Sequence, residues 1–244
     1  MHTFTTLKMI HTLRYLFAIL LINQIAYCQV KFLPTKDLET ALKLAQSQHK
    51  LIFIQVEGDN CNQCNEVADK GLSGSLLTEK FDKHFVSFRA KSDTPFTEQL
   101  KEKYTLTAMP VSLFLDARGN LIHRFLGSNS ADFIYAKEAD IAISRKEDTP
   151  MDQLHSQFQK GDHRPSFLEN YLDRLKQLKL PNTDVLNTFT GTLPVDSLSS
   201  PRIIKFVLEN APSLDSKPYL LLNAANSVDH GMEKLYRTIP YSEA

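Results

Sequence analysis

The cysteine pair in Cys61-Asn62-Gln63-Cys64 constrains this chain more than any other feature of its sequence. It follows the apolar run Leu51–Val56, which predicts a strand covered on both faces. It precedes residues 65–77, which have helical periodicity. Two thiols at this spacing, where a buried strand turns into a helix, can close a small disulfide and open it again. The helix N-terminus favours the thiolate of Cys61, the species that attacks another disulfide, so the motif predicts dithiol–disulfide exchange.

A zinc half-site and a permanent structural disulfide are the alternative interpretations of this motif. A structural zinc site usually needs four Cys or His ligands. This chain has three cysteines and eight scattered histidines, and no close histidine pair follows the motif. A structural disulfide with so short a loop would restrain the unfolded chain little. Redox exchange is therefore the favoured interpretation, and we expect no metal and no cofactor.

The N-terminal segment 1–28 has the pattern of a secretory signal peptide. It contains Lys8 and Arg14, no acidic residue, a short apolar core, and small residues at positions −3 and −1 before Gln29. The apolar core is short for a transmembrane span. We expect cleavage after Cys28, a periplasmic or secreted mature protein, and no membrane contact after cleavage.

An uncleaved membrane anchor and a lipoprotein modified at Cys28 are the alternatives for this segment. Tyr27 disfavours the lipoprotein, because a small residue is expected before a lipidated cysteine. Cleavage after Cys28 would leave Cys61 and Cys64 as the two remaining cysteines, which avoids mispairing in an oxidising compartment.

The composition is ordinary for a globular protein, with 42% hydrophobic and 23% charged residues. Removal of the N-terminal segment takes away two of the 28 basic residues and none of the 28 acidic ones, so the mature chain carries a net charge of about −2. No basic patch indicates a nucleic-acid partner. The length of the mature chain allows one domain of typical size and a smaller one. The sequence gives no indication of the oligomeric state.

The first half of the mature chain alternates helical and strand patterns. Helices are expected at residues 35–49, 65–84, 96–104 and 131–144, and strands at 51–56, 85–88, 111–115 and 121–125. The glycines at 71 and 74 break the second helical pattern into two helices or one kinked helix. The early β-α-β order predicts parallel pairing and the later hairpin an antiparallel edge. The expected fold class is α/β, a mixed sheet with helices on both faces.

The second half, from about residue 149, shows no strand pattern. Helices are expected at residues 150–158, 167–178, 182–193, 201–210 and 217–237. The pattern predicts an all-α C-terminal region, a small array of helix pairs that packs against the first domain. Peptide binding is the alternative role of this region. The chain therefore divides into a signal peptide (1–28), an α/β domain (29–147) and a helical region (148–244).

Residues 35–145 resemble the thioredoxin superfamily, particularly its exported bacterial thiol–disulfide oxidoreductases. The matching features, in order, are the strand, the C-x-x-C motif, a helix, the segment Thr107-Ala108-Met109-Pro110-Val111-Ser112-Leu113-Phe114-Leu115, and a final hairpin with Gly119 and Gly127. The resemblance implies a thioredoxin-like sheet in which Cys61 attacks and Cys64 resolves the mixed disulfide. It also implies a cis bond before Pro110, contact of Pro110 with the cysteine pair, and substrate binding by the Met109 backbone.

Three features depart from the pattern of this superfamily. Asn60 replaces the usual Trp before the motif, the residues between the cysteines are not Gly-Pro, and Gln55 replaces a buried Asp that is thought to deprotonate the second cysteine. Glu57 lies on the same strand face as Gln55, and these two residues are the candidates for that proton transfer. Acids at Glu57, Asp59 and Glu66 disfavour a further negative charge, so we expect a less acidic Cys61 and a more reducing couple.

The sequence thus predicts a thiol–disulfide oxidoreductase acting on protein disulfides outside the cytoplasm, with an unidentified redox partner. The alternative is a binding or scaffold protein, in which the thioredoxin-like domain is a packing module and the helical region recognises a partner.

Overall fold

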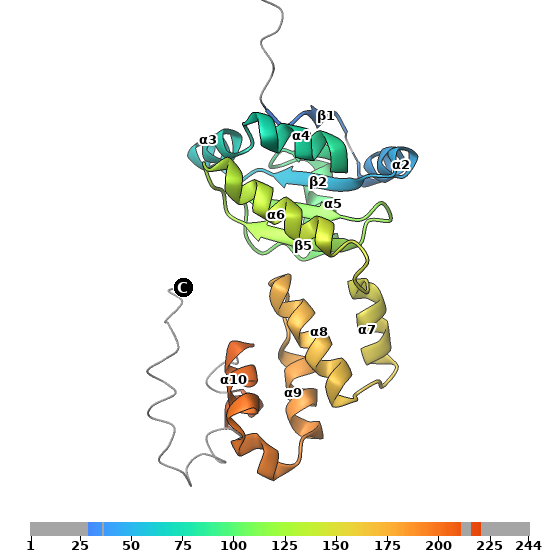
Figure 1. The fold of residues 1–244 in the computed structure, drawn as a ribbon, viewed down its shortest axis with the longest axis vertical. Helices are drawn as coiled ribbons and strands as arrows, with labels where there is room; N and C mark the ends of the chain where they lie inside the picture. The colour runs from blue at the N-terminus through green and yellow to red at the C-terminus, as the bar shows by residue number, and fades with distance from the viewer. Residues whose placement is uncertain (1–28, 36, 211–215, 221–244) are drawn as a thin grey trace, which may run out of the picture.

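A computed structural model describes residues 29–35, 37–210 and 216–220 of the chain. It shows a sheet-containing half followed by a helical half (Figure 1). The expected signal peptide, including Cys28, and the part of the expected last helix beyond Leu220 lie outside the described residues. Within the described ranges, every helix is too short or too polar to cross a membrane.

The first half is a five-stranded mixed sheet with helices on both faces, as the sequence predicts. Its elements in chain order are β1 (Phe32–Leu33), α2 (Leu38–Gln48), β2 (Leu51–Val56), α3 (Asn62–Gly71), α4 (Ser75–His84), β3 (Phe85–Ala90), α5 (Pro95–Tyr104), β4 (Val111–Leu115), β5 (Leu121–Leu126) and α6 (Asp132–Ser144). The strands lie in the order β1-β3-β2-β4-β5. Strand β2 pairs parallel with β3 and antiparallel with β4, and β4 pairs antiparallel with β5.

The central strand β2 divides its side chains between two cores because successive residues point to opposite faces. Ile52, Ile54 and Val56 are fully buried with the apolar residues of α2 and α5. Phe53 points the other way, into a cluster formed with α4 and α6, where its ring lies 4.8 Å from that of Phe81. The continuous apolar run of β2 is therefore explained by burial on both faces.

The expected break between residues 71 and 74 separates two helices, α3 and α4. Gly74 precedes α4 with φ = 133°, a conformation that L side chains rarely adopt. Helix α3 starts earlier than expected, at Asn62, because Cys61 serves as its N-cap. The sequence also missed β1, a two-residue strand paired with β3 that is too short to show an alternating pattern.

The helical half has no strand among its described residues, as expected. Its elements are α7 (Met151–Gln159), α8 (Pro165–Gln177), α9 (Thr183–Thr192), the short 3-10 helix η1 (Val195–Ser199), which the sequence did not predict, and α10 (Pro201–Glu209). These elements share an apolar core of their own around Leu172, Phe189 and Val207, all fully buried.

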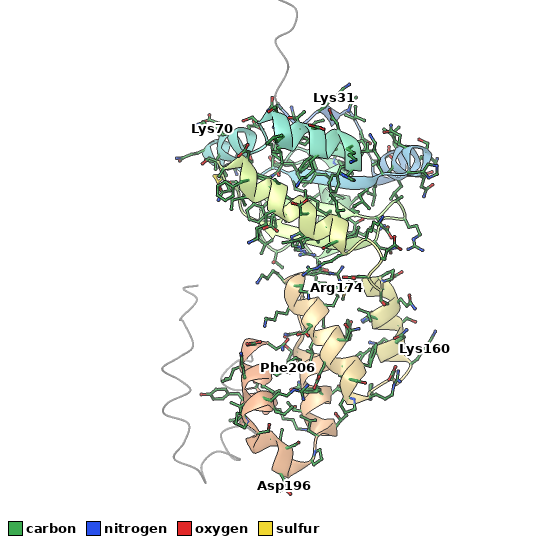
Figure 2. The ribbon with its side chains drawn as sticks, viewed as in Figure 1. Lys31, Lys70, Lys160, Arg174, Asp196 and Phe206 are labelled. Carbon is green, nitrogen blue, oxygen red and sulfur yellow. A yellow bond between two sulfur atoms is a disulfide. The ribbon has the colours of Figure 1, made fainter. Side chains whose placement is uncertain are left out.

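Arg174 joins the two halves (Figure 2). It lies on α8, is 6% exposed, and donates a 2.6 Å hydrogen bond from Nη2 to the carbonyl oxygen of Ile122. Ile122 belongs to β5, the outer strand of the sheet, so Arg174 satisfies a carbonyl at a free sheet edge. Asp148 lies 3.8 Å from the same guanidinium. The packing of the helical region against the first domain that the sequence predicts is seen at this contact.

We expect Gly71→Ala to destabilise the protein strongly and Gly191→Ala to be neutral or stabilising. A Cβ on Gly71 would overlap the backbone oxygen of Asn129 and lie 2.5 Å from the Tyr135 ring, whereas one on Gly191 meets nothing within 4 Å. Ala is preferred to Gly in helices by up to about 1 kcal/mol. The free energy of unfolding from urea titration measures both effects. Equal effects of the two substitutions would contradict the close packing of α3 against the segment before α6.

Replacing Arg174 with Ala should lower the free energy of unfolding by about 1–3 kcal/mol, because it leaves the Ile122 carbonyl without its donor. Arg164→Ala is the matched control. That arginine is 76% exposed and paired with Asp162, so its loss should cost less than about 1 kcal/mol. Similar losses for both variants would show that the Arg174 contact does not hold the halves together.

Candidate active site

The two cysteines of the motif form a disulfide at the start of α3. Their Cα atoms are 5.2 Å apart, and both residues are half-buried. The Sγ atom of Cys61 accepts a 3.3 Å hydrogen bond from the backbone N–H of Cys64, so the first sulfur occupies the N-cap position of the helix. Unpaired N–H groups and the helix dipole both favour negative charge at this place. The geometry places the sulfur of Cys61 where a thiolate is stabilised.

Gly58, in the loop between β2 and α3, lies close to both Cys61 and Pro110. Gly58 is buried in this loop, and a Cβ on it would lie 3.0 Å from Cδ of Pro110 and 3.4 Å from Cβ of Cys61. A side chain at position 58 would therefore require Pro110 or Cys61 to shift by a few tenths of an ångström. Asn65 holds the loop, since its Oδ1 accepts a 2.9 Å hydrogen bond from the backbone N–H of Gly58. The proline and the first cysteine thus both border Gly58.

The expected cis bond between Met109 and Pro110 is confirmed. Pro110 is buried, Met109 is half-buried, and the preceding Ala108 is exposed. The carbonyl oxygen of Pro110 accepts a 2.9 Å hydrogen bond from the N–H of Gly127, which follows β5. Three chain segments therefore meet at one end of the sheet, and the Met109 segment is reached from solvent.

Gln55 lies fully within the domain at 2% exposure. Its Oε1 accepts a 2.7 Å hydrogen bond from the hydroxyl of Ser112, its direct neighbour on β4, and its Nε2 donates to the carbonyl of Val56 at 3.3 Å. A neutral amide with both ends bonded is a stable buried polar group. An amide does not titrate as a carboxylate does, so of the two candidates for proton transfer, Glu57 is the one with the required chemistry.

Glu57 lies just beyond β2 and is held by a cation from the neighbouring strand. Its carboxylate lies 3.6 Å from the guanidinium of Arg89, and the same guanidinium also pairs with Asp69 on α3. Arg89 further stacks over the ring of Phe32, 4.5 Å from its centroid. Arg89 is opposite Gln55 in the parallel register of β2 and β3, which places Glu57 on the expected face of the strand.

Asp59 is paired in the same way, with Lys101 on α5 at 3.5 Å. Lys101 also binds Glu98 at 2.9 Å, and this hydrogen bond is the main reason that the pKa of Lys101 is raised. Two of the three acids that lie near Cys61 in sequence therefore face cations, and their repulsion of a thiolate is reduced. Glu66 is exposed, without an ion pair among the described residues.

The structure thus brings Cys61, Cys64, Met109 and Pro110 to one end of the sheet. Gln55 is buried near the end of β2, and Glu57 follows that strand directly. Sequence reasoning missed Gly58, Asn65 and Arg89. Gly58 shows a local signal, a glycine in the loop just after a strand. Arg89 shows none, because its pairing depends on the register of two strands. In the part of the chain that the structure describes, no cluster of three or more His, Cys, Asp or Glu side chains could hold a metal ion.

Comparison with known proteins agrees with this geometry. Residues 38–139 match the family model of the thioredoxin-like domain. A comparison with curated protein sequences found no match. Among solved structures, a thioredoxin from Thermus thermophilus is 20% identical, covering 49% of this chain and 91% of its own, with a TM-score of 0.42.

Two further structures have a similar degree of likeness. A proposed disulphide isomerase of Bacteroides thetaiotaomicron is 23% identical and covers 50% of this chain and 96% of its own, with a TM-score of 0.41. The DsbH oxidoreductase is also 23% identical and covers 50% of this chain and 91% of its own, with a TM-score of 0.38. The assignment rests on the family model and on the sheet order rather than on these likenesses. Residues 38–139 form a thioredoxin-like domain with a Cys61–Cys64 disulfide at the N-terminus of helix α3.

Proposed function

We propose that this protein is a thiol–disulfide oxidoreductase that reduces protein disulfides outside the cytoplasm. One observation carries the proposal. The disulfide between Cys61 and Cys64, two cysteines separated by two residues, lies at the N-terminus of helix α3 in a thioredoxin-like domain. Cys61 and Pro110 both lie close to Gly58.

The reaction begins from the reduced dithiol form. The Cys61 thiolate attacks one sulfur of a client disulfide, a mixed disulfide forms, and the other client sulfur leaves as a thiolate. The thiolate of Cys64 then attacks the sulfur of Cys61 and releases the second client sulfur. Two electrons pass to the client, and the protein is left with the Cys61–Cys64 disulfide. A dithiol reductant of the compartment has to reduce it again, and we expect a redox partner for this step.

The direction of electron flow is argued from the surroundings of the sulfurs. In the described residues, the one hydrogen bond to either sulfur comes from the backbone N–H of Cys64. The residues between the cysteines, Asn62 and Gln63, are neutral and exposed. A strongly oxidising couple needs extra stabilisation of the thiolate by neighbouring cations. The cations near the motif, Arg89 and Lys101, are paired with acids, so they add no unbalanced positive charge beside Cys61. This balance reduces the acid repulsion expected from the sequence, and the support for a reducing couple is the absence of extra thiolate stabilisation by a cation among the described residues.

Clients are expected to bind along the Met109 segment. It follows an exposed residue, precedes β4, and borders the loop that carries Cys61. An extended client segment can pair with the backbone of Met109 as an added strand and so bring its disulfide to Cys61.

The first test concerns the order of the two thiols. We expect Cys64→Ser to accumulate mixed disulfides with client proteins on a non-reducing gel, because the resolving thiol is missing. Cys61→Ser, the matched control, should accumulate none, and both variants should lose the reduction of insulin by dithiothreitol that the unaltered protein catalyses. Equal trapping by the two variants would refute the assignment of Cys61 as the attacking thiol. Absence of insulin reduction by the unaltered protein would favour the scaffold alternative.

The second test concerns the compartment. The full chain, expressed in a Gram-negative host, should lose its first 28 residues and begin at Gln29, because segment 1–28 has the order of a signal peptide. Mass spectrometry of the N-terminal peptide measures this. A retained Met1 or a lipid on Cys28 would contradict cleavage at this site, and recovery in the cytoplasmic fraction would contradict the proposed location.

A further inference from the structure

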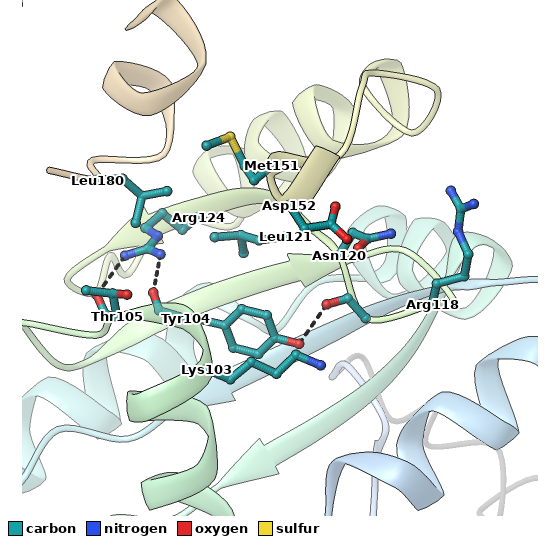
Figure 3. Close-up of a pocket in the computed structure, with 11 residues that line it drawn as sticks. Lys103, Tyr104, Thr105, Arg118, Asn120, Leu121, Arg124, Met151, Asp152 and Leu180 are labelled. Carbon is teal, nitrogen blue, oxygen red and sulfur yellow. Dashed lines mark hydrogen bonds between the residues drawn. The ribbon is translucent and has the colours of Figure 1, made fainter. Parts of the chain in front are cut away.

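A pocket of about 360 Å³ lies where the thioredoxin-like domain meets the helical half (Figure 3). It is bordered by the end of α5, the turn between β4 and β5, β5 itself, the first turn of α7 and the segment after α8. Its volume is in the range of small-molecule sites. The pocket does not include the cysteines or the Met109 segment, so the redox function does not account for it.

Arg124 on β5 is a buried cation at the wall of this pocket. It is 4% exposed, and its guanidinium donates to the carbonyls of Tyr104, at 2.5 Å, and Thr105, at 3.4 Å (Figure 3). Its Nε has no hydrogen-bond partner, and no carboxylate in the described part of the chain lies within ion-pair distance. Burial lowers the pKa of this arginine to about 10. Burial of a charge without an anionic partner costs free energy, so Arg124 lacks a negative charge that would balance its own.

The two carbonyls compensate this charge in part. They belong to the C-terminal end of α5, where the helix dipole amounts to about half a negative elementary charge. A full positive charge is therefore left partly unbalanced. Arg174, a similarly buried arginine at the same junction, also has an Nε without a partner, but it differs from Arg124 in having the carboxylate of Asp148 at 3.8 Å.

Lys103 adds a second cation to the pocket wall. Its side chain makes no ion pair among the described residues, and its Nζ lies 5.6 Å from the centroid of the Tyr104 ring. Arg118, also at the wall, is already paired with Asp116 at 3.3 Å. The acid that lines the pocket is Asp152, whose Oδ1 accepts the N–H of Gln153. The lining therefore carries an excess of positive charge.

Part of the remaining wall is apolar. Leu121 comes from the thioredoxin-like domain, whereas Met151 and Leu180 come from the helical half, and all three are buried or half-buried. We propose that this pocket binds a small organic anion, with its carboxylate or phosphate group at Arg124 and its apolar body against Leu121, Met151 and Leu180. Lys103 lies at the other end of Tyr104, near Gly119, and attracts the anion at longer range (Figure 3). Because the walls come from both halves, such a ligand also joins them.

Calorimetric titration of the full-length oxidised protein tests the proposal with three probes of similar shape. Benzoate and phenyl phosphate are anionic, and benzamide is neutral. We expect at least one anion to bind and to raise the midpoint of thermal unfolding, and benzamide to do neither. A lost charge-assisted contact weakens Kd by about tenfold or more, so Arg124→Gln should weaken binding at least that much, whereas Lys103→Gln, which removes a charge at longer range, should weaken it by about two- to threefold. Lys91→Gln, at an exposed lysine far from this pocket, should leave Kd unchanged.

Three outcomes would overturn the proposal: no binding of either anion at millimolar concentrations, equal binding of benzamide, or unchanged anion binding by Lys103→Gln. The exposed Lys103 variant decides the matter if Arg124→Gln does not fold. None of these measurements involves the thiols, so their failure leaves the proposed redox function untouched.

Discussion

Burial of strand β2 on both faces and along both edges is the constraint on which the rest of this structure depends. The strand hydrogen-bonds to β3 on one side and β4 on the other, and its side chains alternate between the α2–α5 core and the α4–α6 core. A strand so enclosed has one register, because a shift by one residue would exchange every side chain between the two cores. The loop that leaves it therefore starts at a defined place, and Cys61 and Pro110 both lie close to Gly58 as a result.

The ends of these strands also set the charges around the cysteines. Arg89 pairs with Glu57 because β3 lies parallel to β2 and next to it. Lys101, on helix α5 after β3, pairs with Asp59 in the loop after β2. The acids near the motif are thereby paired with cations that stand some 30 to 40 residues further along the chain. Each pair is weak by itself in solvent, but it determines whether the acid repels a thiolate or is balanced.

The helical half contacts the thioredoxin-like domain at the edge strand β5. Helix α8 brings Arg174 to the outer strand β5, where a free row of backbone groups would otherwise invite pairing with another chain. The same junction contains two buried arginines in unlike surroundings. Arg174 faces Asp148, whereas Arg124 faces the carbonyls at the end of α5 and a cavity. Arg174 is balanced by a carboxylate and makes a structural contact, whereas Arg124 has no carboxylate nearby and borders the proposed ligand site.

Much of this architecture could be predicted from the sequence. A continuous apolar run located the strand at 51–56, and the hairpin pattern located the strand at 111–115. Helical periodicity located the helices of both halves, and glycines at 71 and 74 located the break between α3 and α4. The cysteine spacing and the resemblance to thioredoxins placed the disulfide and the cis bond before Pro110. These features are encoded locally, in periodicity, turn residues and a short motif, so a single chain segment is enough to show them.

The tertiary structure alone decided the rest. Strand β1 has two residues and exists because β3 offers it an edge, and the early start of α3 depends on the cap formed by Cys61. The pairing of Glu57 with Arg89, and the unpaired burial of Arg124 beside a pocket built from both halves, join residues that are distant in the chain. No local pattern encodes such contacts, because strand register and helix packing bring these side chains together only after the sheet and the helical half have assembled.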